Sequence, residues 1–265
     1  MQAQRLSAAR GVIWVSAAFL LYRRGPALLT MLTMFYLLVI MACGLIQPIG
    51  PFLLPLLLPT LTVMLANGCR LLDPTQPKQP TPTARGALWR GIKQQRGPLL
   101  RLGALQLAGT LIVLGLDLLF AGGDWSAMGA GDDVVEPLHL ARLLLLAAPM
   151  LLAFWFAPLL TAWDGIPAAK SLFFSLVAAL RNWRAFFVYS ATVLAVAAVI
   201  PALLLAGASL VSATLAMVIS SALRMIMILV LAPVLVASVF TSYRDVFRTP
   251  DPDPAPAVAP VEANP

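Results

Sequence analysis

Six long apolar stretches, separated by shorter polar connections, dominate the hydrophobic pattern of the chain. They cover approximately residues 26–47, 52–67, 98–121, 143–163, 185–206 and 213–240. A bilayer core about 30 Å thick is crossed by a helix of about 20 mostly apolar residues. Because hydrocarbon cannot pair backbone polar groups, such stretches must be helical. The pattern therefore predicts an all-α polytopic membrane protein, with six transmembrane helices in one integral membrane domain, residues 1–248.

A shorter amphipathic segment precedes the first, third and fifth of these stretches. The three segments are residues 12–22, 83–96 and 168–184. In the last one, apolar side chains recur at helical spacing from Leu172 to Leu180. The opposite face carries Lys170, Ser171, Ser175 and Arg181. This pattern is typical of a helix that lies in the membrane interface, with its basic face toward anionic headgroups.

Prolines mark the second, fourth and sixth stretches. Pro59, Pro158 and Pro233 fall in corresponding places, and Pro51 and Pro55 precede Pro59 at intervals of four residues. Proline inside a helix removes a backbone donor and bends the helix. A broken helix can also line a transport site, but no polar side chain lies between residues 48 and 60. Bent packing helices are favoured, and the chain is predicted to repeat three times a unit of one interfacial helix and one helical hairpin.

Basic residues are concentrated in alternate connections, and this asymmetry predicts the orientation. Segments 1–25, 70–101 and 164–184 are rich in Lys and Arg, whereas residues 122–140 hold four acids and no Lys or Arg. The positive-inside rule then places both termini in the cytoplasm. The Pro/Ala-rich segment 249–265 is predicted to be a disordered cytoplasmic tail. The candidate contacts with anionic lipid or with a protein partner are Arg85, Arg90, Lys93, Arg96, Lys170, Arg181 and Arg184.

Three ionisable residues fall inside the predicted spans. Asp117, Arg142 and Arg224 all lie toward the outer side, and an ionisable residue in a membrane is a functional candidate by default. They could form a solute or proton relay, but one acid and two bases are few groups for a translocation pathway. We expect a structural charge pair between Asp117 and Arg142 or Arg224. The acidic loop between Asp117 and Arg142, which includes Glu136 and His139, offers too few ligands in fixed geometry to predict a metal site.

The sequence contains no pattern that predicts enzyme chemistry or a cofactor. No nucleophile–base set, phosphate-binding glycine loop or zinc spacing is present. The net charge of +7 is divided among short loops, which excludes a nucleic-acid-binding patch. The favoured hypothesis is a non-catalytic protein that acts as a scaffold, helps assembly or interacts with lipid, with membrane lipids and other membrane proteins as partners. The alternative is a small permease or exporter for lipid-like or apolar solutes.

Several short motifs together suggest a relationship. They are Trp14 and Phe19, the phrase RRGP at 23–26, the proline-rich stretch 48–59 and S-x-x-D-V-F at 242–247. With these motifs the chain resembles an uncharacterised family of six-span inner-membrane proteins from proteobacteria. It is more distantly similar to the membrane domain of glycerophosphodiester phosphodiesterases. The resemblance implies a location in the bacterial inner membrane and supplies no catalytic residues.

Overall fold

The computed structural model describes residues 4–75, 84–120 and 137–247, and all regular secondary structure in these ranges is helical. Part of the predicted outer loop and the predicted tail at 249–265 lie outside the described residues. The helices are α1 (Arg10–Arg24), α2 (Pro26–Leu45), α3 (Gly50–Leu72), α4 (Ala84–Leu88), α5 (Arg96–Phe120), α7 (Pro137–Asp164), α8 (Ala168–Arg181), α9 (Trp183–Leu194), η1 (Ala195–Val199), α10 (Ile200–Val211), α11 (Ala213–Ile226), η2 (Met227–Leu231) and α12 (Ala232–Phe247).

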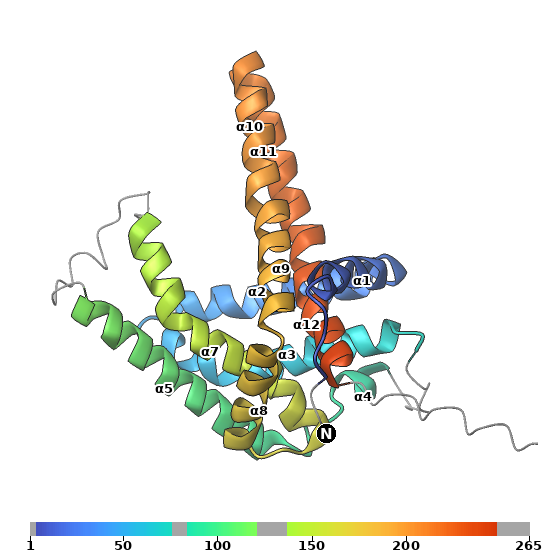
Figure 1. Cartoon of the computed structure of the whole chain (residues 1–265), viewed down its shortest axis with the longest axis vertical. Helices are drawn as coiled ribbons and strands as arrows, with labels where there is room; N and C mark the ends of the chain where they lie inside the picture. Colours follow the sequence, from blue (N-terminus) through green and yellow to red (C-terminus); the bar gives the residue numbers. More distant parts are fainter. Residues whose placement is uncertain (1–3, 76–83, 121–136, 248–265) are drawn as a thin grey trace, which may run out of the picture.

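Six helical segments of the described chain are long and apolar enough to cross a membrane, as the hydrophobic pattern predicts. They are Pro26–Leu45, Gly50–Leu72, Arg96–Phe120, His139–Asp164, Trp183–Val211 and Ala213–Phe247. They form three hairpins: α2 with α3, α5 with α7, and a third in which α9, η1 and α10 lead out while α11, η2 and α12 return (Figure 1). In the third hairpin, the outgoing segment extends beyond the predicted span 185–206 at both ends. The returning segment begins at residue 213, as predicted, and continues beyond residue 240 to Phe247.

The core lies at one end of the molecule, which we call the hub. The hub comprises the short helices α1, α4 and α8, the N-terminal parts of α2, α5 and α9, and the C-terminal parts of α3, α7 and α12. Trp14, Phe156 and Phe240 are fully buried there. From the hub the three hairpins diverge, and α10 and α11 stand clear of the other helices (Figure 1). Packing within the protein is therefore concentrated at one end.

The middle interfacial helix is much shorter than predicted. Residues 83–96 were expected to form one amphipathic helix, but α4 ends at Leu88 and turns follow. Gly91 has a φ of +75°, a backbone conformation that interrupts a helix. A Cβ at Gly91 would lie 2.3 Å from the carbonyl oxygen of Ala162, so α7 approaches the turn too closely for any side chain. Close packing against α7 thus replaces the expected helical turns.

Proline interrupts the third hairpin, and neighbouring hydroxyl groups compensate. Pro233 cannot donate to the carbonyl of Leu229, four residues earlier, and the π-helix η2 precedes it. Tyr22 Oη and Thr30 Oγ1 donate to that carbonyl oxygen, at 3.0 and 3.2 Å. The residues before Pro201 likewise form a π-helix, η1. Helices α1 and α2 therefore supply the hydrogen bonds that the interrupted returning helix of the third hairpin lacks.

In the second hairpin, a serine from α8 enters the backbone hydrogen bonding of α7. Ser175 Oγ, on α8, accepts a hydrogen bond from Phe156 N at 2.9 Å and donates to Leu152 O at 3.0 Å. It thus bridges the donor and acceptor that a regular helix would join directly, two residues before the buried Pro158. Pro55 and Pro59 lie inside α3, as predicted, whereas Pro51 occupies the first turn of α3. At that place a proline removes no helical hydrogen bond and does not bend the helix.

Helix α8 divides its faces differently from the predicted pattern. Lys170 and Arg181 are exposed, but Ser171 and Ser175, expected beside them, are buried against α7. Thr161 Oγ1 donates to Ser171 Oγ at 2.9 Å, which ties the two helices together. The apolar side chains of Phe173, Val177 and Leu180 are exposed. In a membrane this face is available to lipid, because hydrocarbon removes the need to bury apolar groups in the protein.

Trp14 provides a test of the hub. We expect Trp14→Ala to destabilise the protein by about 3 kcal/mol or more, because truncating a buried Trp leaves a cavity. Trp14 is 1% exposed, packs edge-on to Phe186 at 5.3 Å, and donates through Nε1 to Asp245. The effect is measured by thermal unfolding of the detergent-purified chain, with size-exclusion chromatography used to monitor the loss of folded protein. The control is Leu20→Ala on the same helix, where the side chain is 57% exposed. Equal losses from both variants would contradict the placement of the core.

Candidate functional site

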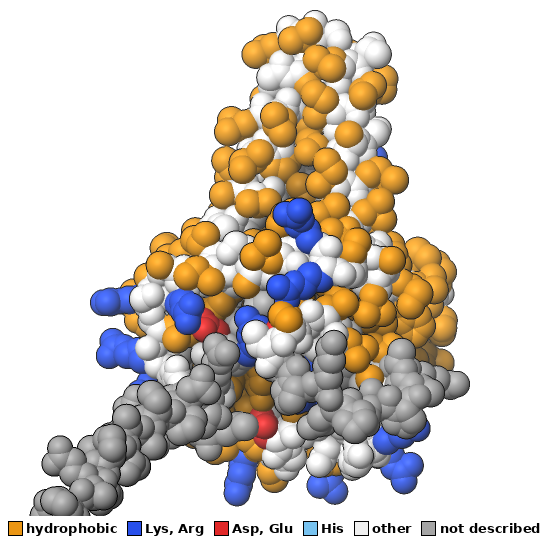
Figure 2. All heavy atoms as spheres, turned by 90° about the vertical axis from the view of Figure 1, so that its right-hand side faces the viewer, with side chains coloured by type: hydrophobic (Ala, Val, Ile, Leu, Met, Phe, Trp, Pro, Cys, Tyr) orange, Lys and Arg blue, Asp and Glu red, His pale blue; other side chains and the backbone are white. Residues whose placement is uncertain are grey.

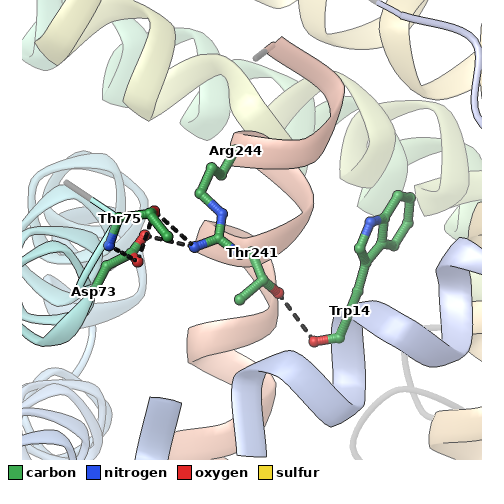
Figure 3. Close-up of polar contacts among 5 residues, drawn as sticks. All are labelled: Trp14, Asp73, Thr75, Thr241 and Arg244. Carbon is green, nitrogen blue, oxygen red and sulfur yellow. Dashed lines mark hydrogen bonds and ion pairs between the residues drawn. The ribbon is translucent and has the colours of Figure 1, made fainter. Parts of the chain in front are cut away.

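The last turn of α12 is clamped to the end of α3 by an ion pair (Figure 3). Arg244 Nη1 lies 2.6 Å from Asp73 Oδ2, and the Asp73 side chain is 1% exposed. The other oxygen of Asp73, Oδ1, accepts hydrogen bonds from Thr75 N and Thr75 Oγ1. Both carboxylate oxygens are therefore occupied, and two segments 171 residues apart in sequence are held together.

The other side of α12 is tied to α1 (Figure 3). Thr241 Oγ1 donates to the backbone oxygen of Trp14 at 3.0 Å. Trp14 Nε1 donates to Asp245 Oδ2 at 2.8 Å, and Arg10 Nη2 lies 2.9 Å from Asp245 Oδ1. The helix that ends the described chain is thus held between the first helix and the first hairpin.

A buried asparagine connects α3, α7 and the turn after α4. Asn67 is 2% exposed, and its Nδ2 donates to the backbone oxygens of Leu88 and Arg90. Its Oδ1 accepts a hydrogen bond from Trp163 Nε1 at 3.0 Å. The guanidinium of Arg70 lies over the Trp163 ring, 5.2 Å from the centroid. All polar atoms of the Asn67 amide are used, so this residue specifies how the elements meet rather than offering a free ligand group.

The partners of Asp73 determine the direction in which the pKa of its carboxyl group is shifted. Burial alone would raise the pKa of the Asp73 carboxyl group, because a low-dielectric setting disfavours the charge. The hydrogen bonds from Thr75 and Arg244 outweigh burial and hold its pKa below the ordinary value of 3.8. The carboxylate therefore stays charged to more acidic pH than a free aspartate does.

Of the three ionisable residues predicted inside the spans, the structure brings two together. Arg142 Nε donates to Asp117 Oδ1 at 2.8 Å, and the Asp117 side chain is 1% exposed. His139 Nε2 lies 3.4 Å from Asp117 Oδ2, a contact that the sequence analysis did not identify. Glu136, one helical turn before His139, lies outside the described residues. The cluster joins α5 to α7 near the tip of the second hairpin.

Arg224 lies on a different hairpin from Asp117. It is on α11, its side chain is exposed, and its Nη2 donates to Ser220 Oγ at 3.3 Å. None of the ion pairs among residues 4–75, 84–120 and 137–247 includes Arg224. Two open furrows on the hairpin, of about 580 and 310 Å³, are lined in part by Arg224 and Ser220. The expected pairing of Asp117 with either arginine is thus made by Arg142, and Arg224 keeps a free charge.

The predicted basic contacts lie around the hub. Lys93, Arg96, Lys170, Arg181 and Arg184 are exposed, and Arg90 is half-buried. The side chain of Arg85 is outside the described set. Figure 2 shows Lys and Arg side chains mainly around the body of the molecule, whereas the protruding hairpin is covered by apolar side chains. The basic residues that the structure describes here take part in no ion pair, so their charges are available to an external anion.

The described residues contain no group of three or more His, Cys, Asp or Glu side chains able to hold a metal ion. Cys43 and Cys69 are free and buried. What the described residues offer chemically is a basic surface at the hub, a charged cluster within the second hairpin and the exposed cation of Arg224 on the third.

Comparison with known proteins gives one informative match. The chain is 36% identical over 203 residues to a probable inner membrane protein of Burkholderia thailandensis, across 71% of this chain and 74% of that protein. No family model matches the chain, and no solved structure matches it. The relative supports the inner-membrane location, while the more distant resemblance to glycerophosphodiester phosphodiesterases stays a prediction.

The clamp at Asp73 predicts a pH dependence. A carboxyl group with a lowered pKa in the folded state contributes stability that is fully present above its unfolded pKa and is lost as the pH falls through the folded pKa. We therefore expect the melting temperature to fall below pH 3.8, the ordinary value for aspartate. Thermal unfolding between pH 7 and pH 2.5 measures this. Asp73→Asn should be less stable at pH 7 and lose less on acidification. An unchanged acid response in that variant would contradict the assignment.

The cluster in the second hairpin predicts non-additive losses. Asp117→Asn leaves Arg142 without its partner, and breaking a buried ion pair costs about 3–5 kcal/mol, reduced here because Arg142 is partly exposed. We expect Asp117→Asn and Arg142→Gln each to lower the melting temperature. The double variant should lose less than the sum, because the residues act as one unit. Arg101→Gln, an exposed arginine on α5, is the matched control. Additive losses would show that the contact carries little energy.

Proposed function

The chain belongs to the family of the Burkholderia thailandensis inner-membrane protein, and we propose that it is a non-catalytic scaffold that organises partner proteins and lipid at the inner membrane. The observation that carries this proposal is the unpartnered third hairpin. Helix α11 contains no buried residue, and α10 buries Ala208. Internal packing does not require this hairpin to be so long, and its surface is free to meet another membrane protein.

The unpaired charge on the hairpin specifies the kind of partner. Arg224 lies twelve residues beyond Ser212 at the hairpin tip, about 18 Å along a helix with a rise of 1.5 Å per residue. A charge at such a depth in hydrocarbon is expensive and is stabilised by an opposite charge or by water. Ser209, Ser220 and Ser221 line the same furrow and allow close helix packing. The partner that fits is a transmembrane helix with an Asp or Glu at the matching depth.

The hub provides the contact with lipid in this proposal. The exposed basic residues listed above lie beside exposed apolar side chains, such as Phe173 on α8. Anionic headgroups attract such residues by about 1 kcal/mol each. Positive charge is favoured on the cytoplasmic side, so the hub and both termini would face the cytoplasm. The hub would then hold the protein at the inner leaflet, while the third hairpin presents its free surface within the membrane.

The contacts of the short helices support the proposed threefold repeat. Helix α4 packs on α3, α8 packs on α7, and α1 packs on α12. Each short helix thus contacts the returning helix of the preceding hairpin, and α1 closes the circle through the last hairpin. The returning helices α3, α7 and α12 also contact one another. A scaffold of three similar units, of which one carries an extended arm, accounts for these contacts.

Transport of a solute has less support than a scaffold role. A permease requires polar groups that converge from several helices near the middle of the membrane. Asp117 is already held by Arg142, and Arg224 lies on another hairpin. The charges therefore do not line one common path.

A photo-crosslinking experiment tests the scaffold proposal. A photoreactive amino acid replaces Ser221, which lies beside Arg224, in the full chain in native membranes. We expect an adduct with one membrane protein, in which the crosslinked transmembrane segment contains an Asp or Glu. Arg224→Leu should reduce the adduct about tenfold, the equivalent of 1.4 kcal/mol, whereas Arg224→Lys should keep most of it.

Two controls complete the experiment. The same photoreactive residue at Leu145, which is 75% exposed on α7, should not give this adduct. An adduct that is unchanged by Arg224→Leu would contradict the proposal. So would an adduct of the chain with itself, because Asp117 is already bound to Arg142.

A further inference from the structure

An apolar groove lies where α1 meets the third hairpin. It has a volume of about 470 Å³, within the range of about 300–1,000 Å³ of small-molecule sites. Val15 and Phe19 line it from α1, Val196 and Ile200 from the outgoing helix, and Val230 from the returning helix. Between Leu223 and Val234 the groove follows the hairpin for about 16 Å at 1.5 Å per residue. The groove therefore extends along the helix, as an extended hydrocarbon chain requires.

The polar side chains of the groove already have hydrogen-bond partners within the protein. Its hydroxyl side chains are Ser16 and Thr192. Ser16 Oγ donates to Ile13 O, and Thr192 Oγ1 donates to Val188 O, so each is bonded to its own helix. No hydroxyl group of the groove is therefore free to bind a ligand, and the lining offers only apolar contacts. Such a lining favours an aliphatic chain over a polar solute.

Both π-helices of the third hairpin border this groove. Val196 belongs to η1, and Met227 and Val230 belong to η2. The irregular turns close with i→i+5 bonds, from Ile200 N to Ala195 O and from Ala232 N to Met227 O. π-turns are uncommon and occur frequently at functional sites. Their occurrence on both helices at the same groove is a second feature that distinguishes this surface from the rest of the hairpin.

A basic residue continues the α1 face that lines the groove. Val12, Ser16 and Phe19 line the groove, and Arg23 follows on the same helical face one turn later. Arg23 is exposed, and no ion pair of the described chain involves it. The neighbouring Tyr22 donates to Leu229 O, which holds this end of α1 against η2. A cation thus lies on α1 one turn beyond the last residue of this helix that lines the groove.

From this combination we propose that the groove binds one anionic phospholipid, with an acyl chain along the hairpin between η1 and η2 and its phosphate at Arg23. The inference rests on the proposed lipid contact of the hub and deepens it, because it replaces general attraction by one defined site. A lipid held in this way joins α1 to the third hairpin across a gap that protein side chains leave open. It is a structural component of the corner from which the arm extends.

The test uses the full chain in phosphatidylcholine vesicles that contain a small fraction of phosphatidylglycerol with a diazirine in its acyl chain. After illumination, peptide mass spectrometry locates the adducts. We expect them to concentrate on residues 192–201 and 223–234, and to be few on residues 203–218 of the same hairpin. Replacing the probe by diazirine phosphatidylcholine should lower the groove adducts about fivefold, as expected for loss of one contact between a basic residue and an anionic lipid.

Matched variants identify the groove and the headgroup contact. Val230→Trp, which fills the groove, should remove most of its adducts, whereas Leu210→Trp, at a site 89% exposed, should not. Arg23→Gln should abolish the preference for the anionic probe, and Arg24→Gln, on another face of α1, should keep it. Val230→Trp can disturb folding. The comparison of the two probes on the unaltered chain therefore tests the lipid site independently of this variant.

Three outcomes would overturn the proposal. They are adducts spread evenly along the hairpin, equal groove labelling by both probes, and a crosslink in which a second copy of the chain occupies the groove. Arg224→Leu should leave the groove adducts unchanged. Failure of the protein crosslink at Ser221 would therefore count against the scaffold role, and failure of the lipid adducts would count against this site alone.

Discussion

Side-chain hydroxyl groups that satisfy the backbone of interrupted helices hold this structure together. Inside hydrocarbon an unpaired backbone carbonyl is costly, and proline creates one four residues before itself. Tyr22 and Thr30 satisfy the carbonyl of Leu229, and Ser175 bridges Leu152 and Phe156. In both cases the donor comes from another element. The interrupted helices are therefore satisfied by contact with other elements, which couples α7 to α8 and η2 to α1 and α2.

This coupling gives the molecule two parts with different properties. Near the hub, aromatic packing around Trp14 and the ion pair of Arg244 with Asp73 leave few degrees of freedom. Toward the hairpin tips, contact is mostly between the two helices of one hairpin. A protein built in this way can offer long lipid-facing surfaces without weakening its core. Recognition of lipids or proteins on those surfaces does not compete with the interactions that determine the fold.

The sequence was sufficient for the features that depend on a single helix and insufficient for those that depend on neighbours. Six apolar stretches and the proline positions follow from composition and spacing. The shortness of α4 does not, because it depends on how closely the Ala162 carbonyl approaches Gly91. From the sequence, Asp117, Arg142 and Arg224 were placed inside apolar stretches, but the choice of partner for Asp117 stayed open. Asp117 pairs with Arg142 because α5 packs on α7, whereas Arg224 lies on the third hairpin.

The buried face of α8 also depends on a neighbouring helix and could not be predicted from the sequence alone. Ser171 and Ser175 share the polar stripe of Lys170 and Arg181, and a soluble helix would expose all four. Here the serines meet polar atoms of α7, and Lys170 and Arg181 are exposed. Small hydroxyl residues can satisfy a neighbouring backbone, whereas lysine and arginine need water or headgroups. Residue size, rather than polarity alone, separates the two roles.

The contact between α1 and α12 has a consequence for how the protein is made. Trp14 and its partner Asp245 are 231 residues apart, and Asn182 accepts a hydrogen bond from Leu6 N across 176 residues. Helix α1 therefore meets its partner α12 only after the helices between them have been synthesised. Each hairpin can enter the bilayer as it emerges, but the hub closes last. A chain truncated before α12 would be inserted and yet lack the contacts that close the hub.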